Sequence, residues 1–211
     1  MSEERAEKGG SAGSMRDCWS CGTTVAVRAP FCHACGVIQA PQPVDHFTRL
    51  NLPARFDLQR ADIERQYFGL QRYFHPDRFA AKPARERALS SQHATDLNEA
   101  YEVVKDPLRR AEYLLALMGR PVQGDACSTI SDPRVLLEAM EMREELAEAQ
   151  SAAEIESIVA RVEAECEAVL DEVADAFARE AFDLAGRHCI RLRYLTRLAA
   201  EAHERRARLE A

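Results

Sequence analysis

The sequence has no apolar run near the roughly 20 residues that a membrane-spanning helix needs, so we expect no membrane partner. It also lacks a basic excess. The 28 Lys and Arg stand against 35 Asp and Glu, and a net charge of −7 gives no reason to expect nucleic acid as a partner. Residues 1–15 have no apolar core and predict a disordered tail rather than a secretory signal or transit peptide. We therefore expect a cytoplasmic protein, or one of the mitochondrial matrix if the source is eukaryotic.

Seven cysteines, an odd number in a chain with no export signal, do not fit a disulfide framework. Cys18, Cys21, Cys32 and Cys35 form two C-x-x-C pairs, each followed by a glycine that supplies the dihedrals of a metal knuckle. Four thiolates in this arrangement predict one structural Zn²⁺ per chain in a module of residues 16–40. A closed site has no open position for substrate, so we assign it no catalysis. A redox role for the C-x-x-C pairs is the alternative, but the βαβ context of thioredoxin-like motifs is absent.

Downstream of this module, apolar residues recur at helical spacing. Ile63, Tyr67, Leu70 and Phe74 share one face of a helix predicted over 57–74, with Asp57 as its N-cap. Pro76 lacks an N–H and disfavours helical dihedrals at the preceding residue, so this helix should end near Phe74. A returning helix is predicted over 85–105 and another around 108–117. The tripeptide His75-Pro76-Asp77 then lies at the tip of a helical hairpin.

The last part of the chain predicts an antiparallel three-helix bundle over residues 132–211, after a turn-rich connector at 119–131. Its first helix should be capped by Ser131 or Asp132, with Pro133 at the first position. The second is predicted over 151–173 and the third over 176–209, where Gly186 weakens the pattern. Of the chain's charged residues, 19 of 35 acidic and 11 of 28 basic ones lie in the bundle. This asymmetry indicates different partners for the two halves.

Residues 45–118 resemble a J domain, the co-chaperone module that stimulates ATP hydrolysis by DnaK-type chaperones. The resemblance rests on Tyr67, Leu70, His75-Pro76-Asp77, Asn98-Glu99-Ala100-Tyr101, Asp106-Pro107 and Arg110-Ala-Glu-Tyr113. It implies that His75, Pro76 and Asp77 meet the chaperone's ATPase domain, where Asp77 pairs with an arginine and Pro76 holds it in register. The plainer alternative is that His75 only favours the dipole at a helix C-terminus.

One feature departs from many general J domains, which carry a Lys/Arg pair directly after the position of Tyr67. Here Phe68 and Gly69 occupy those positions. The basic contacts to the chaperone must then come from other side chains of the hairpin, which are Arg65, Arg72, Arg78 or Lys82. The alternative for each of them is a solvated surface charge.

Two segments of the bundle narrow the resemblance to the HscB family, the J-type co-chaperones of iron–sulfur cluster biogenesis. Residues 136–146 resemble the client-binding helix of that family and residues 192–195 the matching part of its last helix, while the cysteine module resembles its tetracysteine form. The resemblance implies a docking surface for an IscU-type scaffold, with an apolar centre and an acidic rim. Its residues would be Leu136, Leu137, Met140, Glu141, Glu144, Glu148 and Tyr194. Alternatively, Leu137 and Met140 belong to the bundle core.

The sequence thus predicts an all-α fold: a J-domain hairpin and a three-helix bundle, preceded by a zinc knuckle. It predicts a non-enzymatic adaptor that brings a scaffold to an HscA-like, DnaK-type chaperone and stimulates its ATPase through the His75 loop. The alternative is a general J protein that serves unfolded clients. The acidic bundle and the lack of a glycine-rich linker after the J domain argue against it. A homodimer is compatible with the sequence.

Overall fold

The computed structural model describes residues 14–122 and 133–209, with the backbone alone for residues 133–136 and 139. Its elements are β1 (Met15–Asp17), β2 (Thr24–Ala26), α1 (His46–Arg49), α2 (Arg60–Phe74), the 3-10 helix η1 (Pro76–Phe79), α3 (Ala84–Lys105), α4 (Pro107–Leu117), α5 (Pro133–Glu148), α6 (Ala152–Ala178) and α7 (Phe182–Leu209). These elements confirm the predicted all-α fold with a small four-cysteine module at its start. The described residues up to Leu52, together with Arg65–Tyr101, form one compact unit. Pro53–Glu64 and the described residues from Glu102 onward form the other.

The four-cysteine module contains a short sheet that the sequence did not predict, since strands of three residues are too short to show alternation. Strands β1 and β2 pair antiparallel, with Met15 opposite Ala26. Val25 is fully buried and packs with Cys18 and Cys32 in a small core. The first unit of the chain therefore begins with a folded module that has its own apolar centre.

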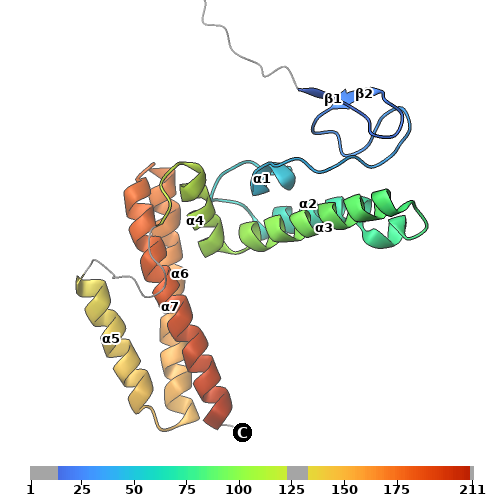
Figure 1. Cartoon of the computed structure of the whole chain (residues 1–211). Helices are drawn as coiled ribbons and strands as arrows, with labels where there is room; N and C mark the ends of the chain where they lie inside the picture. The colour runs from blue at the N-terminus through green and yellow to red at the C-terminus, as the bar shows by residue number, and fades with distance from the viewer. Residues whose placement is uncertain (1–13, 123–132, 210–211) are drawn as a thin grey trace, which may run out of the picture. The chain divides into compact units, whose positions relative to one another are not determined.

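Helices α2 and α3 form the predicted hairpin and run antiparallel (Figure 1). The rings of Tyr67 and Tyr101 stack with centroids 4.0 Å apart, and the Tyr67 hydroxyl donates to Asn98 Oδ1 at 2.9 Å. Nearer the tip, the Ser90 hydroxyl donates to the Phe74 carbonyl at 2.8 Å. Helix α2 ends at Phe74 as predicted.

The predicted start of α2 was wrong, because the helix begins at Arg60 and Asp57 is not its N-cap. Phe56 is buried and stacks on Phe177 of α6, with ring centroids 5.1 Å apart. A tight turn follows, closed by the Leu58 N–H donating to the Phe56 carbonyl. Anchoring of Phe56 therefore holds the chain out of helical conformation at Asp57.

The second unit is built on α6 and α7, which run side by side, while α5 and α4 pack against α7 (Figure 1). Its core is lined by buried residues from three helices, which include Leu146, Ile155, Val162, Val169, Leu192, Leu195 and Leu198. Ser151 caps α6 in a reciprocal capping box with Glu154, and α5 begins at Pro133 as predicted. Helix α7 continues through Gly186, so the glycine does not interrupt it.

Some predictions fall outside the described residues. They are the tail up to residue 13, most of the connector at 119–131 and the cap at Ser131 or Asp132. Within the described residues, no helix is both long and apolar enough to cross a membrane.

Because the bundle core depends on α7, we expect Leu195→Ala to lower the free energy of unfolding of the bundle by about 2–5 kcal/mol, the usual cost of removing a buried leucine side chain. Leu195 is 2% exposed, whereas Leu209 on the same helix is 51% exposed. The matched change Leu209→Ala should cost less than about 0.5 kcal/mol. Urea unfolding followed by far-UV circular dichroism measures both, and equal losses would contradict the assignment of α7 to the core.

Candidate functional site

The His75-Pro76-Asp77 loop is a short, ordered and exposed turn at the hairpin tip. His75 leaves the helical region with φ −57° and ψ 127°, as expected for a residue before proline. Its Nδ1 accepts from the Asp77 backbone N–H at 3.3 Å, and its carbonyl accepts from the Arg78 N–H at 3.0 Å. All three side chains are exposed, and that of Asp77 keeps 90% of its surface. The loop thus presents a carboxylate whose backbone is held by its neighbours.

Two of the predicted basic residues, Arg72 and Arg78, lie close to this loop in the chain, whereas Arg65 lies further back on α2. Arg65, Arg72 and Arg78 are all exposed on α2 and η1. Arg78 Nη1 donates to the Arg72 carbonyl at 2.6 Å, which fixes one guanidinium beside the end of α2. A shallow pocket next to His75 is lined by residues of both hairpin helices, among them Gln71, Ser91, Ala94, Thr95 and Asn98. The tip therefore combines a carboxylate, several cations and a small recess.

Sequence reasoning missed the residues that support the loop from inside. Phe79 is buried at the end of η1 and anchors the far side of the turn. Ser90 is also buried, and its hydroxyl donates to the Phe74 carbonyl, which has no helical partner at the C-terminus of α2. A phenylalanine shortly after the tripeptide was a visible signal for an anchor. A serine sixteen residues away gave none.

The four predicted metal ligands come together in the structure. The sulfurs of Cys18, Cys21, Cys32 and Cys35 all lie within 4.8 Å of one another. The Cys18–Cys35 and Cys21–Cys32 sulfur pairs are 3.7 Å apart, and all four cysteines are free thiols. A tetrahedral ion with metal–sulfur bonds of about 2.3 Å places its ligands about 3.8 Å apart. The donor set therefore fits a tetrahedral metal ion.

The backbone around these sulfurs has the shape of two knuckles. Gly22 and Gly36 have φ values of 73° and 72°, in the left-handed region that glycine occupies without strain. Their N–H groups donate to the carbonyls of Cys18 and Cys32. The Ser20 N–H and the Gln39 side-chain amide both reach Cys18 Sγ, at 3.4 and 3.3 Å. The sulfur of Cys18 therefore accepts two N–H hydrogen bonds and can bind a metal ion as well.

Electrostatics at Cys18 favour the thiolate that a metal ligand requires. Burial by itself would raise the pKa of this thiol, but backbone N–H groups of Cys21 and Ser20 and the neighbouring sulfurs lower the pKa to about 6. Cys18 is therefore poised to bind as a thiolate near neutral pH.

Helix α5 has two distinct faces. Met142, Leu146 and Ala149 pack into the core of the bundle. Leu137 and Met140 instead remain 58% and 54% exposed. On the same outward side, separated by helical spacing, stand the exposed carboxylates Glu141, Glu144 and Glu148. The structure therefore places five of the predicted docking residues on one open surface, which we call the α5 outer face; the side chain of Leu136 lies outside the described residues.

Tyr194, another predicted docking residue, belongs to a different helix from the α5 outer face. It comes from α7, is half-buried and packs against the bundle core. Burial raises the pKa of its phenol. Only part of this ring is therefore open to a partner.

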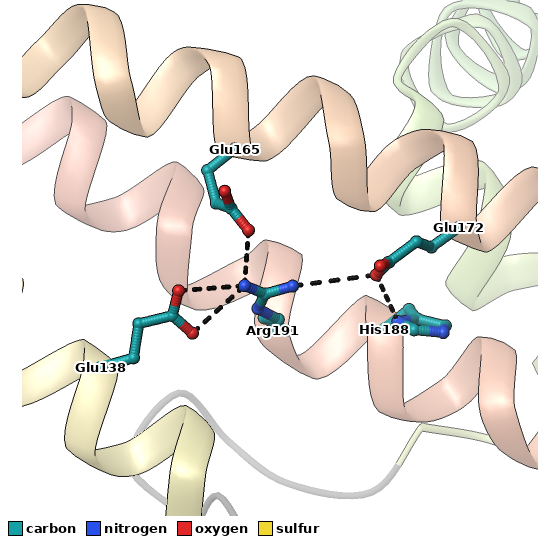
Figure 2. A network of polar contacts seen from close by, with 5 residues as sticks. All are labelled: Glu138, Glu165, Glu172, His188 and Arg191. Carbon is teal, nitrogen blue, oxygen red and sulfur yellow. Dashed lines mark hydrogen bonds and ion pairs between the residues drawn. The ribbon is translucent and has the colours of Figure 1, made fainter.

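A polar network that sequence reasoning missed holds α5 to the other two helices of the bundle (Figure 2). Arg191 of α7 lies between Glu138 of α5 and Glu165 of α6, with donor–acceptor distances of 3.0 and 2.5 Å. Glu172 is 3.8 Å from the other guanidinium nitrogen and also pairs with His188 at 3.0 Å. The only sign of this network in the sequence was the presence of arginines among many acidic residues in the bundle. Because Glu138 is next to Leu137, this network fixes the part of α5 that carries the outer face.

Comparisons with known proteins agree with this arrangement. A family model described as the HSCB C-terminal oligomerisation domain matches residues 131–203. The co-chaperone protein HscB of Proteus mirabilis is 32% identical over 170 residues, which cover 79% of this chain and 98% of the relative. The iron–sulfur cluster co-chaperone protein HscB of Mus musculus is 34% identical over 185 residues, or 86% of this chain and 79% of the relative.

A solved structure extends the similarity to almost the whole chain. The crystal structure of human co-chaperone protein HscB is 31% identical and superposes with a TM-score of 0.85, covering 90% of this chain and 98% of that one. Identity above 30% over 79–98% of the length of these relatives indicates membership of one family as well as a shared fold. The chain therefore belongs to the HscB family of co-chaperones.

Proposed function

We propose that this protein is a non-enzymatic adaptor that binds an IscU-type iron–sulfur scaffold and delivers it to an HscA-like, DnaK-type chaperone. The name of the mouse relative, an iron–sulfur cluster co-chaperone, supports the pathway. The observation that carries the proposal is the presence on one chain of two open surfaces of different character. One is the His75-Pro76-Asp77 loop in a J domain of residues 45–118, and the other is the α5 outer face in a bundle of residues 132–211. We place its action in the cytoplasm, or in the mitochondrial matrix of a eukaryote.

The loop is proposed to act on the chaperone by pairing rather than by chemistry. The Asp77 carboxylate is open to a partner arginine, and a charge-assisted hydrogen bond of this kind is strong and directional. Pro76 and the His75 hydrogen bond fix the backbone that carries the carboxylate. Arg65, Arg72 and Arg78 offer cations to an acidic surface beside it. ATP is hydrolysed by the chaperone, whose conformational equilibrium the loop shifts.

Replacing Asp77 with Asn should abolish this effect while leaving the fold intact, because the side chain is exposed and the amide keeps its size. We expect the stimulation of the chaperone ATPase to fall by about tenfold or more, the cost of losing one charged hydrogen bond. Steady-state ATP hydrolysis measures it. The matched change Asp171→Asn, at an exposed aspartate of α6, should leave stimulation unchanged. Full stimulation by the Asp77 variant would refute the proposed role.

The α5 outer face is proposed to dock the scaffold. Its two apolar side chains supply area to bury, and the surrounding glutamates select a partner with basic residues at matching positions. Arg191 and Glu138 hold the underlying helix in place, so little order has to be gained on binding. The partly buried Tyr194 is proposed to extend the contact from α7.

The double change Leu137→Ala and Met140→Ala should weaken scaffold binding by about tenfold or more, because central apolar side chains carry much of the energy of an interface. Isothermal titration with the scaffold measures the dissociation constant. Leu117 and Met118 form a matched exposed pair at the end of α4. Changing that pair to alanine should leave affinity unaltered, and an equal loss in both double variants would remove the α5 outer face from the proposal.

The metal of the cysteine cluster is proposed to be a structural Zn²⁺ held by Cys18, Cys21, Cys32 and Cys35. Zinc supplies no redox chemistry and, with four thiolate ligands, leaves no position for substrate. Its binding free energy stabilises a module that is too small to fold on a core of a few residues.

Elemental analysis of the purified chain should find about one zinc ion per molecule. The four thiols should resist alkylation until the metal is removed or the protein is denatured, because bound thiolates are not free to react. The single change Cys35→Ser should lower the zinc content and release the remaining three thiols. Metal-free protein with a reversible disulfide among these cysteines would favour the redox alternative instead.

A further inference from the structure

We propose that Phe31 and Gln39 of the four-cysteine module are positioning residues for the His75-Pro76-Asp77 loop. The module would then brace the chaperone-binding tip rather than serve only as a separate folded appendage. This inference rests on the proposed function of the loop, and it follows from two sets of contacts that join the cysteine cluster to the end of α2 within one compact unit.

The first set of contacts is aromatic. Phe31 directly precedes the ligand residue Cys32, and its ring stacks on Phe74 with centroids 5.9 Å apart and planes 8° from parallel. Phe74 also stacks against His93 of α3, with centroids 4.4 Å apart and planes 5° from parallel. Phe74 is also the last residue of α2 and is joined by a peptide bond to His75. The ring of Phe31 therefore closes a three-ring stack around the residue from which the loop begins.

The second set of contacts is polar. Gln39 is 1% exposed, and its side-chain amide donates to the sulfur of Cys18 at 3.3 Å. Its backbone carbonyl lies 2.8 Å from His93 Nε2. A carbonyl can only accept, so Nε2 carries the proton. Burial lowers the pKa of His93, which keeps the ring neutral with this one nitrogen protonated. Gln39 thus connects a metal-ligating sulfur to the ring that supports Phe74.

A third contact joins the module to α3, the second helix of the hairpin. Trp19, between the first two cysteines, lies under the guanidinium of Arg85 near the start of α3, 4.3 Å from the ring centroid. Its indole N–H donates to the Ile38 carbonyl at 2.7 Å. The module therefore touches α2 where the loop begins and α3 just after the loop ends.

These contacts have a physical consequence for the loop. Proline prevents α2 from continuing, so the backbone at Phe74 depends on side-chain contacts to hold its direction. Two of the groups that contact Phe74 are tied to the cysteine cluster: the ring of Phe31 is next to Cys32 in the chain, and the ring of His93 is hydrogen-bonded to Gln39. Ordering of the cluster therefore restricts the conformations of the Asp77 carboxylate, which lowers the entropy lost when the chaperone binds.

The test compares two variants of the full zinc-loaded chain. Phe31→Leu removes the aromatic ring, and Phe31→Tyr keeps it. We expect Phe31→Leu to raise amide hydrogen exchange over residues 75–80 by about threefold or more, at unchanged zinc content and with no change in exchange over α6 and α7. Phe31→Tyr should exchange like the unaltered chain. Phe68→Leu provides the matched control, since Phe68 is half exposed on the open side of α2 and should leave loop exchange unaltered.

A second readout separates positioning from mere stability. In chaperone ATPase assays, Phe31→Leu should raise the concentration needed for half-maximal stimulation by about threefold or more, while the maximum at saturation is retained. Removing the zinc with a strong chelator should reproduce the increase in loop exchange. Unchanged loop exchange in Phe31→Leu, or failure of Phe31→Tyr to restore it, would overturn the inference even if Asp77→Asn abolishes stimulation. If Asp77→Asn has no effect, the proposed function fails, whereas the exchange data still decide whether the module braces the loop.

Discussion

The termination of α2 at Phe74 is the constraint on which the first unit depends. A helix end leaves carbonyl groups without partners, and Pro76 removes the option of simply extending the helix. Three features stabilise this helix end: a hydroxyl from Ser90, a buried Phe79 beyond the turn, and two aromatic rings stacked on Phe74. The exposed loop therefore begins at a residue that several side chains contact.

In the second unit, ion pairs determine which face of α5 packs against the other helices. Helix α5 carries apolar side chains on both faces, one packed in the core and one exposed, and such a helix has no strong preference for either orientation. Arg191 resolves the ambiguity by joining carboxylates from α5 and α6 at the level of Glu138 (Figure 2). The guanidinium is only partly exposed, so these pairs are less screened than those on an open surface.

The sequence was sufficient wherever a local pattern carries the information. The cysteine spacing located the cluster, and proline with helical periodicity located the hairpin tip. It was insufficient where an outcome depends on packing between distant residues. The bond between His93 and Gln39 spans 54 residues with no periodic signal. Asp57 looked like a cap because the anchoring of Phe56 on Phe177 is invisible in the chain. In α5, Leu137 and Leu146 are equally apolar, and only the structure separates the open side chain from the buried one.

The glutamates that border Leu137 and Met140 have a consequence for the protein in concentrated solution. Two copies meeting by two-fold symmetry would bring this same surface against itself, and the three carboxylates of each copy would face those of the other. Like charges at such distances repel, while a basic surface would be attracted. In the proposed docking role, the acidic border would disfavour pairing between two copies and leave the face open to a basic partner.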